Sequence, residues 1–163
     1  MAKIIPLTND GHTTVDDEDY DFLMQWKWRW QAKGPGGRVI RIIMQDGKTH
    51  SLFMHRIILE QYQTIEAGLE VDHRDRNPRN NTRANLRVCT HIQNCYNKSG
   101  SGGKSPFKGV EKNSLRWQAR ISVGGKRLYL GTFIHDIDAA KAYDAAARIY
   151  HGEFAYLNFP ESE

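Results

Sequence analysis

The sequence predicts an α+β fold in two parts: a β-rich N-terminal region, then, after a linker, a three-stranded antiparallel sheet packed on one helix. Two β-rich runs flank an Asp-Gly pair at residues 46–47, a strong hairpin signal. The stretch 97–106, NKSGSGGKSP, has no apolar periodicity and marks a boundary. Beyond it, three short strand patterns precede a helical pattern over residues 136–150.

Composition indicates a folded protein. Of the 163 residues, 39% are hydrophobic and 10% aromatic, which is enough for a packed core. No window approaches 18 apolar residues and no leader is visible, so we expect a cytoplasmic protein without membrane contact. Cys89 and Cys95 form no CxxC pair, which favours reduced thiols over a disulfide scaffold. A zinc site that also uses His91 is the weaker alternative.

The positive charge is concentrated in one block. Residues 98–135 carry 8 basic side chains against 1 acidic, whereas residues 1–60 carry 8 of each. A basic block of this kind is typical of proteins that bind a polyanion, and nucleic acid is the leading candidate. A merely solvated basic face is the alternative.

The first 70 residues predict strands and one short helix. Trp26, Trp28 and Trp30 alternate with basic residues, so we expect a strand whose tryptophan face packs in the core. A base-stacking platform is the alternative. Residues 38–45 and 49–57 flank the Asp-Gly turn as a hairpin, and MHRIILEQY, residues 54–62, predicts a short helix.

A polar segment follows. EVDH and NLRVC predict strands, DRNPRNN between them consists of turn residues, and THIQN opens a helix with a capping box. The segment is therefore strand, loop, strand and helix. Asp72 and His73 should project to opposite faces of a strand end, and Asn94 should lie one turn into the helix.

The C-terminal part predicts a sheet with one covered face. Period 2 places the apolar side chains of the second strand on one face and its arginines on the other. The helix should cover the apolar face, with Asp136 as N-cap and Asp138 in the first turn. Its expected inner face is Ala139, Ala142, Tyr143, Ala146 and Ile149. The open face should carry groups suited to phosphates and base edges of double-stranded DNA: Lys108, Arg116, Arg120, Arg127 and Tyr129.

The motifs FKGV, RWQARI, LYLGTF and AAKAYDAAARIYHGEFAYLNFP resemble the Apetala-type, or ethylene-response-factor, DNA-binding domain of plant transcription factors over residues 105–160. The resemblance implies a three-stranded sheet lying in the DNA groove, backed by the helix. Lys108, Arg116, Arg127 and Tyr129 match the family's DNA contacts. The sequence departs from the family at Glu111 and Ser122, where plant members usually have arginine, and at Tyr129, which replaces a tryptophan. The target site therefore need not be the plant one.

Residues 71–97 resemble the HNH, or ββα-metal, nuclease motif in the form that opens with Asp-His and ends with Asn. IPLT, VDDEDYDFL and MHRIIL also resemble the N-terminal region of phage-type HNH homing endonucleases. The whole chain looks like such an enzyme with an appended DNA-binding domain. The expected domains are 1–97 for the nuclease, 98–104 for the linker and 105–161 for the DNA-binding domain. If the chain is phage-encoded, its location is the host cytoplasm.

The resemblance implies residue roles that fit the chemistry. Asp72 and Asn94 would bind a divalent metal ion, expected to be Mg²⁺, through hard oxygen atoms. His73 would deprotonate the attacking water, and Asn85 would tie the hairpin together and orient His73. His91 is the alternative to Asn94. His55 could touch the site, although a packed or hydrogen-bonded helix residue is favoured. Asn77, Asn80 and Asn81 are expected to form the turn. The arginines expected to hold the phosphate backbone are Arg74, Arg76, Arg79, Arg83 and Arg87.

These expectations converge on a metal-dependent DNA endonuclease of the HNH homing type. The alternative is a sequence-specific DNA-binding regulator with an inactive nuclease motif, and a nuclease of structured RNA is a third reading. The oligomeric state is left open, with a monomer favoured. The target sequence, and whether one strand or two are cut, do not follow from the sequence.

Overall fold

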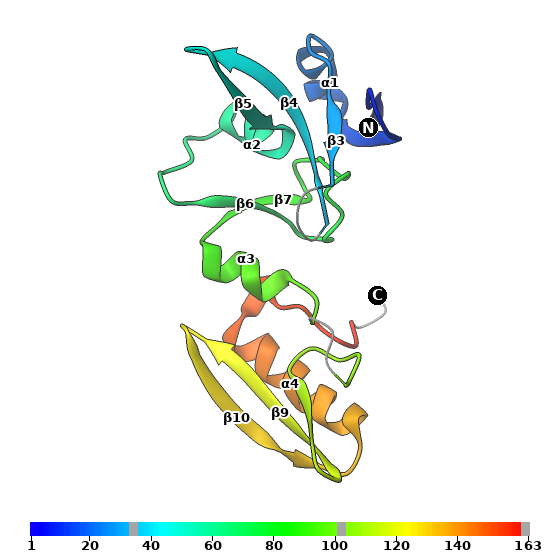
Figure 1. Cartoon of the computed structure of the whole chain (residues 1–163), viewed down its shortest axis with the longest axis vertical. Coiled ribbons are helices and arrows are strands. Elements are labelled where there is room, and N and C mark those ends of the chain that lie inside the picture. Colours follow the sequence, from blue (N-terminus) through cyan, green and yellow to red (C-terminus); the bar gives the residue numbers. More distant parts are fainter. Residues whose placement is uncertain (33–35, 101–103, 161–163) are drawn as a thin grey trace. The chain divides into compact units, whose positions relative to one another are not determined.

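The computed structural model describes residues 1–32, 36–100 and 104–160, in two compact units, Met1–Thr90 and His91–Glu163 (Figure 1). The division lies before the helix of the HNH-like segment, whereas the sequence placed a domain end at residue 97. The predicted linker, residues 98–104, falls partly outside the described residues. Among the described residues, no helix is both long and apolar enough to cross a membrane.

The described residues of the first unit, 1–32 and 36–90, form three small antiparallel sheets and two short helices. Its elements are β1 Ala2–Pro6, β2 His12–Asp16, α1 Asp17–Leu23, β3 Arg29–Gln31, β4 Arg38–Gln45, β5 Lys48–Phe53, α2 Met54–Glu60, β6 Glu70–His73 and β7 Leu86–Cys89. The sheets are β1-β2, β3-β4-β5 and β6-β7. The hairpin and the short helix predicted around residues 46 and 54 are confirmed. Asp46 and Gly47 both have positive φ angles, 51° and 71°, as two-residue hairpin turns require.

The tryptophan-rich stretch differs from the prediction in extent. Helix α1 ends at Leu23, before the first tryptophan, and strand β3 contains only Trp30 of the three tryptophans. Trp28 is 1% exposed, and its indole N–H donates to the Leu23 carbonyl at 2.8 Å. Trp26 and Trp30 pack against the same core, so the core role predicted for these rings is confirmed. The alternation of tryptophan with basic residues suggested a strand from Trp26 onward. Tertiary packing of the rings in the core, which local alternation does not reveal, limits the strand to Arg29–Gln31.

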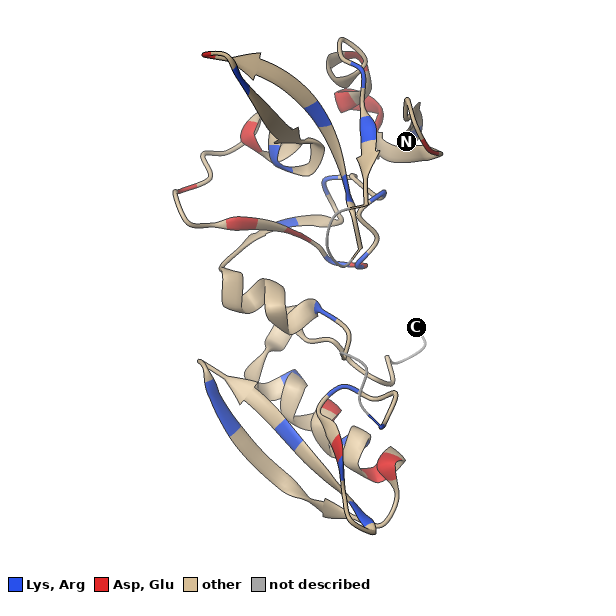
Figure 2. Cartoon of the chain, viewed as in Figure 1, with Lys and Arg blue, Asp and Glu red and all other residues tan. Residues whose placement is uncertain are grey.

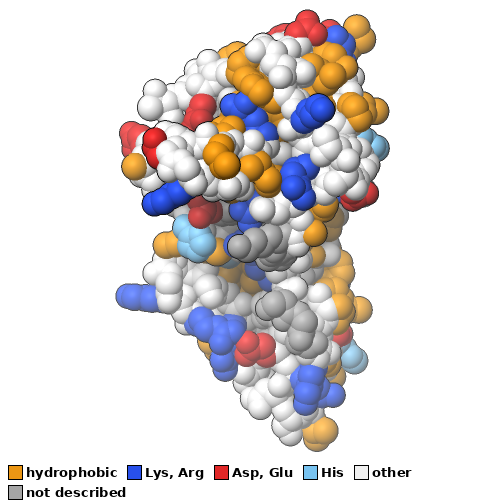
Figure 3. All heavy atoms as spheres, turned by 45° about the horizontal axis from the view of Figure 1, so that its top comes forward, with side chains coloured by type: hydrophobic (Ala, Val, Ile, Leu, Met, Phe, Trp, Pro, Cys, Tyr) orange, Lys and Arg blue, Asp and Glu red, His pale blue; other side chains and the backbone are white. Residues whose placement is uncertain are grey.

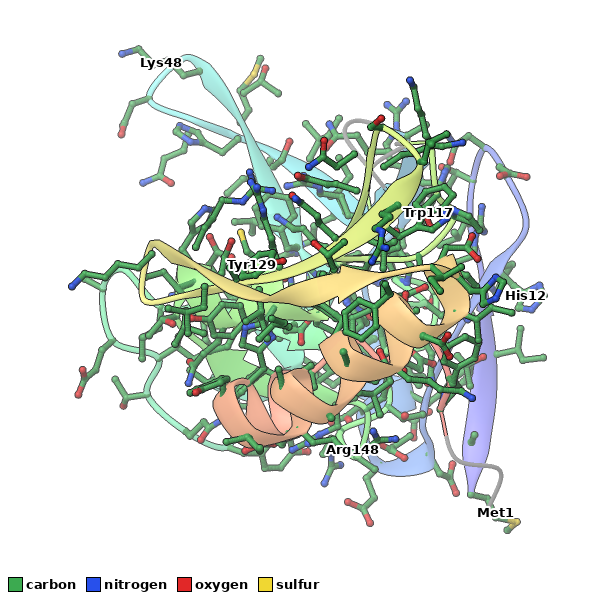
Figure 4. The ribbon with its side chains drawn as sticks, turned by 90° about the horizontal axis from the view of Figure 1, so that it is seen from below. Met1, His12, Lys48, Trp117, Tyr129 and Arg148 are labelled. Carbon is green, nitrogen blue, oxygen red and sulfur yellow. The ribbon has the colours of Figure 1, made fainter. Side chains whose placement is uncertain are left out.

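The second unit is a three-stranded sheet with a long helix on one side. It contains α3 His91–Asn97, β8 Val110–Asn113, β9 Arg116–Val123, β10 Lys126–Phe133 and α4 Asp136–Tyr150, followed by the 3₁₀ turn Gly152–Phe154. The strand order is β10-β9-β8, and α4 lies along β9 and β10 (Figure 4). This confirms the predicted sheet and helix.

The covered face of the sheet agrees with the predicted alternation. Ala119 and Ile121 of β9 are buried, and they pack in clusters with alanines of α4 and with Tyr143. Two helix positions were wrong: Ile149 is 77% exposed, and the N-cap of α4 is His135, so Asp136 is the first helical residue. The small alanines bring α4 close to the strands. Ala146 and Ala147 of the last turn are still buried, so Ile149 lies on the outer side of the helix.

Helix α3 packs against the rest of its own unit. The Tyr96 ring stacks on the His151 ring with centroids 3.6 Å apart and planes 9° apart. The Tyr96 hydroxyl accepts a hydrogen bond from the Gly124 amide at 3.0 Å, and the Tyr96 carbonyl accepts one from the Tyr156 amide at 3.2 Å. The helix that ends the HNH-like segment is therefore built into the second unit.

Candidate functional site

The hairpin β6–β7 pairs Asp72 with Arg87 across its ladder. Both side chains are buried, at 8% and 6% exposure, and Nη2 and Nε of Arg87 donate to Oδ2 of Asp72 at 2.8 and 3.0 Å. Both nitrogens converge on one carboxylate oxygen. The phosphate contact predicted for Arg87 stays a prediction, and in the structure its guanidinium is buried against the Asp72 carboxylate.

His73 contacts the amide of Asn81 on the other side of the strand end. Its Nε2 lies 3.1 Å from Oδ1 of Asn81. The Asn81 amide orientation is fixed because its Nδ2 donates to the Thr13 hydroxyl at 2.8 Å and to the Pro78 carbonyl at 3.1 Å. Oδ1 can only accept, so Nε2 of His73 must carry the proton. Nδ1 is then the basic nitrogen of the ring.

Burial lowers the pKa of His73 below its usual value, against smaller opposing contributions from Asn81 and the nearby carboxylates. The imidazole is therefore neutral near pH 7. A neutral ring whose proton is held on Nε2 can accept a proton on Nδ1. The arrangement has the chemistry of an oriented general base.

The amide that contacts His73 was expected to be Asn85. Asn85 instead closes the loop: its Oδ1 accepts from the Asp75 amide at 2.9 Å, and its Nδ2 donates to Asp75 Oδ1 at 2.8 Å and to the Asn80 carbonyl at 2.7 Å. The part of its role that ties the hairpin together fits these contacts. The orienting contact belongs to Asn81, which had been assigned to the turn.

Burial distinguishes Asn81 from its neighbours. Asn81 is 0% exposed and reaches back to β2, whereas the side chains of Asn77 and Asn80 bond within the loop as turn formers do. No local pattern separates Asn80 from Asn81. The only sequence signal is that a loop with several asparagines must bury some of them with partners.

His55 lies beside His73, although the sequence favoured a packing role for it. The two ring centroids are 5.1 Å apart, with planes at 74°. Burial, with smaller contributions from His73, Arg38 and Arg56, lowers the pKa of His55 to about 3. The site therefore contains two neutral imidazoles.

Asn94 lies in α3, and so it belongs to the second unit together with the alternative ligand His91. Among the described residues, no group of three or more His, Cys, Asp or Glu side chains is arranged to hold a metal ion. The predicted metal ligands are instead the buried carboxylate of Asp72 and the side-chain amide of Asn94. Carboxylate and amide oxygens in small number suit Mg²⁺, which keeps several of its waters. The residue types therefore fit this ion.

Two other arginines of the segment also have internal partners. Arg83 donates from Nε to Asp19 Oδ2 at 2.8 Å, and the Asp19 side chain is 0% exposed. Tyr62 donates its hydroxyl to the same carboxylate at 2.8 Å. The carboxylate partner raises the pKa of Arg83 above its already high value. Arg79 pairs with Asp10 at 2.6 Å. Arg74 and Arg76 are exposed on the loop, and their phosphate contacts stay a prediction.

The open face of the sheet in the second unit carries the predicted arginines. Arg120 lies opposite Tyr129, and Arg127 lies opposite Ser122, so these side chains share one face. Arg116 is exposed at the start of β9. Figure 2 shows basic positions along β9 and β10, and Figure 3 shows basic side chains on the visible surface of both units.

Glu111 lies among these arginines, where the plant family usually has arginine. Its carboxylate accepts from Nη2 of Arg127 at 2.5 Å and lies 3.7 Å from Nη1 of Arg120. These residues also line a hollow of about 530 Å³. The departure at residue 111 therefore places a negative charge within the predicted DNA-reading face.

Lys108, also predicted to contact DNA, points its ammonium at the end of α3. Its Nζ donates to the carbonyls of Tyr96 and Lys98, at 2.6 and 2.5 Å. A cation at a helix C-terminus neutralises the negative end of the helix dipole. This gives Lys108 a structural role, and a DNA contact there remains a prediction.

Comparisons with known proteins find both similarities that the sequence suggested. A sequence model of the HNH endonuclease family matches residues 52–96. An uncharacterized HNH endonuclease of Acanthamoeba polyphaga mimivirus is 33% identical over 106 residues, 65% of this chain and 54% of the relative. Two AP2-like ethylene-responsive transcription factors of Arabidopsis thaliana, AIL7 and PLT2, are 48% identical over 63 residues, 36% of this chain and 13% and 11% of theirs.

The predicted combination of an HNH-type segment and an Apetala-type C-terminal part is therefore confirmed. The chain spans about half the length of the mimivirus relative and a much smaller share of the plant relatives.

Proposed function

We propose that this chain is a metal-dependent DNA endonuclease of the HNH homing type, which hydrolyses phosphodiester bonds at a site recognised with help from its second unit. The observation that carries the proposal is the orientation of His73 by Asn81 within an HNH-type hairpin. A neutral, oriented imidazole next to a buried carboxylate is what a hydrolase that activates water needs.

His73 acts as the general base. Its Nδ1 takes a proton from the water that attacks the phosphorus, while Nε2–H remains bonded to Asn81 Oδ1. That amide oxygen accepts from the imidazolium as it forms, which stabilises the charge without moving the ring. General base catalysis of this kind contributes about 10² to 10⁴ in rate.

Asp72 and Asn94 would hold the metal ion. When bound, Mg²⁺ neutralises charge on the scissile phosphate and on the leaving oxygen. Arg87 orients the Asp72 carboxylate by binding Oδ2 with two nitrogens. Arg87 is thus assigned to the hairpin interior rather than to DNA.

Double-stranded DNA is the proposed substrate, and the open face of the second unit is its proposed reader. Arg116, Arg120, Arg127 and Tyr129 supply guanidinium forks and an aromatic ring on one sheet face. A sheet can enter the major groove, where arginine recognises guanine with both of its outer nitrogens. A second DNA contact on the same chain raises the effective concentration of the nuclease at the target.

Plasmid cleavage tests the proposal. Supercoiled DNA that contains the target, taken from the source genome, should be nicked or linearised with Mg²⁺ and left intact with EDTA. His73→Ala should reduce cleavage by at least 10²-fold and leave DNA binding in a gel-shift assay unchanged. Cleavage at the wild-type rate by His73→Ala would refute the assignment of the base.

The second candidate is a DNA-binding regulator with an inactive nuclease motif. The buried pair of Asp72 with Arg87 favours it, because a guanidinium already neutralises the carboxylate that should bind metal. The same assay separates the two candidates. The regulator binds its site in the gel shift and cuts no DNA with Mg²⁺ or Mn²⁺.

A further inference from the structure

His73 is packed by a second aromatic side chain that the proposed chemistry does not use. His55 lies in the first turn of α2, and its ring meets the His73 ring at 74° with centroids 5.1 Å apart. The His55 ring is itself stacked on Phe53, with centroids 5.7 Å apart and planes 17° apart. Phe53 ends β5 and carries the guanidinium of Arg38 over its ring, 5.1 Å from the centroid. His73 is therefore packed against an ordered stack anchored in β5 and α2.

His55 makes this contact as an uncharged ring. Burial lowers its pKa to about 3, so it carries no proton on its second nitrogen at working pH and does not repel a protonated His73. Its Nδ1 is buried without a hydrogen-bond partner among the described residues. The described contacts of His55 are thus contacts of the ring, and a polar atom is left unused beside the proposed base.

The hydrogen bond to Asn81 does not fix His73 by itself. It holds Nε2 at one point, and the imidazole can still tilt about that bond and swing Nδ1 away from a reacting water. An edge-to-face neighbour restricts the tilt, and such an aromatic pair shifts a conformational equilibrium by roughly 2- to 10-fold. One contact fixes a nitrogen, and the other limits the plane of the ring.

We propose that His55 is a positioning residue for His73, whose ring holds the imidazole in the orientation where Nε2 bonds to Asn81 and Nδ1 acts as the base. The effect of His55 on cleavage rests on the proposed function. The effect of His55 on the tautomer and orientation of His73 does not depend on cleavage. The two effects can therefore be tested separately.

The structural test uses the ring nitrogens of His73. ¹⁵N-labelled full-length protein is compared as wild type, His55→Ala and His55→Phe, with His50→Ala on the exposed end of β5 as the control. Wild type, the control and His55→Phe should show His73 as one Nε2–H tautomer. In His55→Ala the His73 ring is free to tilt away from Asn81 and to lose the hydrogen bond that fixes the proton on Nε2, so His73 should show a mixture of tautomers or an exchange-averaged signal. A wild-type His73 signal in folded His55→Ala overturns the proposal, whether or not the protein cuts DNA.

The catalytic test uses single-turnover cleavage of the target plasmid with Mg²⁺. The aromatic contact shifts the orientation of the His73 ring by roughly 2- to 10-fold, so His55→Ala should lower the cleavage rate by up to about 10-fold with little change in KM. His55→Phe keeps an aromatic ring and removes both nitrogens, including the unpartnered Nδ1, so it should cut within about twofold of wild type. If His55→Phe is as slow as His55→Ala while its His73 signal stays normal, His55 acts through a nitrogen and the positioning role is wrong. If the wild type cuts no DNA at all, the proposed function fails and the nitrogen spectrum alone decides this inference.

Discussion

Replacing Asn81 with alanine tests the central arrangement of the site, because Asn85→Ala is a matched control in the same loop. Both amides are buried, and each has three side-chain hydrogen bonds. Of these two amides, Asn81 is the one that contacts His73, whereas the side-chain hydrogen bonds of Asn85 go to Asp75 and Asn80. The two variants therefore remove similar amounts of loop structure and differ in whether the proposed base loses its partner.

The expected loss of stability is similar for the two variants. A hydrogen bond contributes about 0.5–1.5 kcal/mol net, and buried partners left unsatisfied add to this. Three lost bonds therefore cost about 2–4 kcal/mol of unfolding free energy in either variant. In a domain of this size each 1 kcal/mol lowers Tm by roughly 4–8 °C. Urea unfolding monitored by tryptophan fluorescence measures the loss, since Trp28 lies in the core of the same unit.

The expected loss of activity differs. Asn81→Ala removes the acceptor that fixes the proton on Nε2 of His73, so the ring samples both tautomers and several orientations. We expect cleavage to fall by about 10²-fold at a temperature where both variants are folded. Asn85→Ala should cut within about tenfold of wild type. Equal losses in the two folded variants would refute the claim that Asn81 orients the base, and a larger loss in Asn85→Ala would restore the role first predicted for Asn85.

Two further predictions concern the second unit. Burial lowers the pKa of His151, whose neutral ring donates Nε2–H to the Ser122 carbonyl. The contribution of the neutral ring to the unfolding free energy is therefore complete above about pH 6.5, the pKa of an unfolded histidine. It is lost as the pH falls through the lower pKa of the folded state. His151→Phe, which retains a ring to stack on Tyr96, should flatten the pH dependence of the unfolding free energy by up to about 1.4 kcal/mol per pH unit in that window, and an unchanged slope contradicts this. Glu111→Gln should release Arg127 to bind a phosphate and raise the affinity for non-specific DNA several-fold. The slope of log K against log salt concentration should become steeper by about 0.9, the value for one additional phosphate contact. Fluorescence anisotropy measures both quantities, with Glu66→Gln as the control. Unchanged affinity would show that Glu111 does not restrain Arg127 in solution.

The elements that follow from local sequence were predictable. The Asp-Gly turn sets its own hairpin because two adjacent positive φ angles suit few other residues. The alternation in β9 fixes which side chains face α4, since the side-chain period of a strand is two. The strand, loop, strand and helix order of residues 70–97 also emerged from local signals. In each case the residues that determine the element lie within it.

The partners of the polar side chains were not predictable, because they come from distant segments. Asn81 bonds to Thr13, 68 residues earlier, and Arg83 bonds to Asp19, 64 residues earlier. A run of arginines and asparagines suggests a phosphate-binding surface, and it also suits the interior of a loop that has no apolar core. Only burial separates the two. Arg87 belongs to the arginine-rich run that suggests a phosphate-binding surface, yet its side chain is buried.

The loop between β6 and β7 shows why asparagine suits a site of this kind. A loop with few apolar side chains gains little from the hydrophobic effect, so its shape depends on polar groups that satisfy one another. An amide donates and accepts at once: Asn85 accepts from the Asp75 amide and donates to the Asp75 carboxylate and the Asn80 carbonyl. Asn81 uses two donor bonds to fix itself and its oxygen to fix His73. A carboxylate at residue 81 would accept from His73 but would face the Pro78 carbonyl without a proton to donate. The neutral amide therefore does two things at once: it holds the loop and keeps the proton of His73 on Nε2.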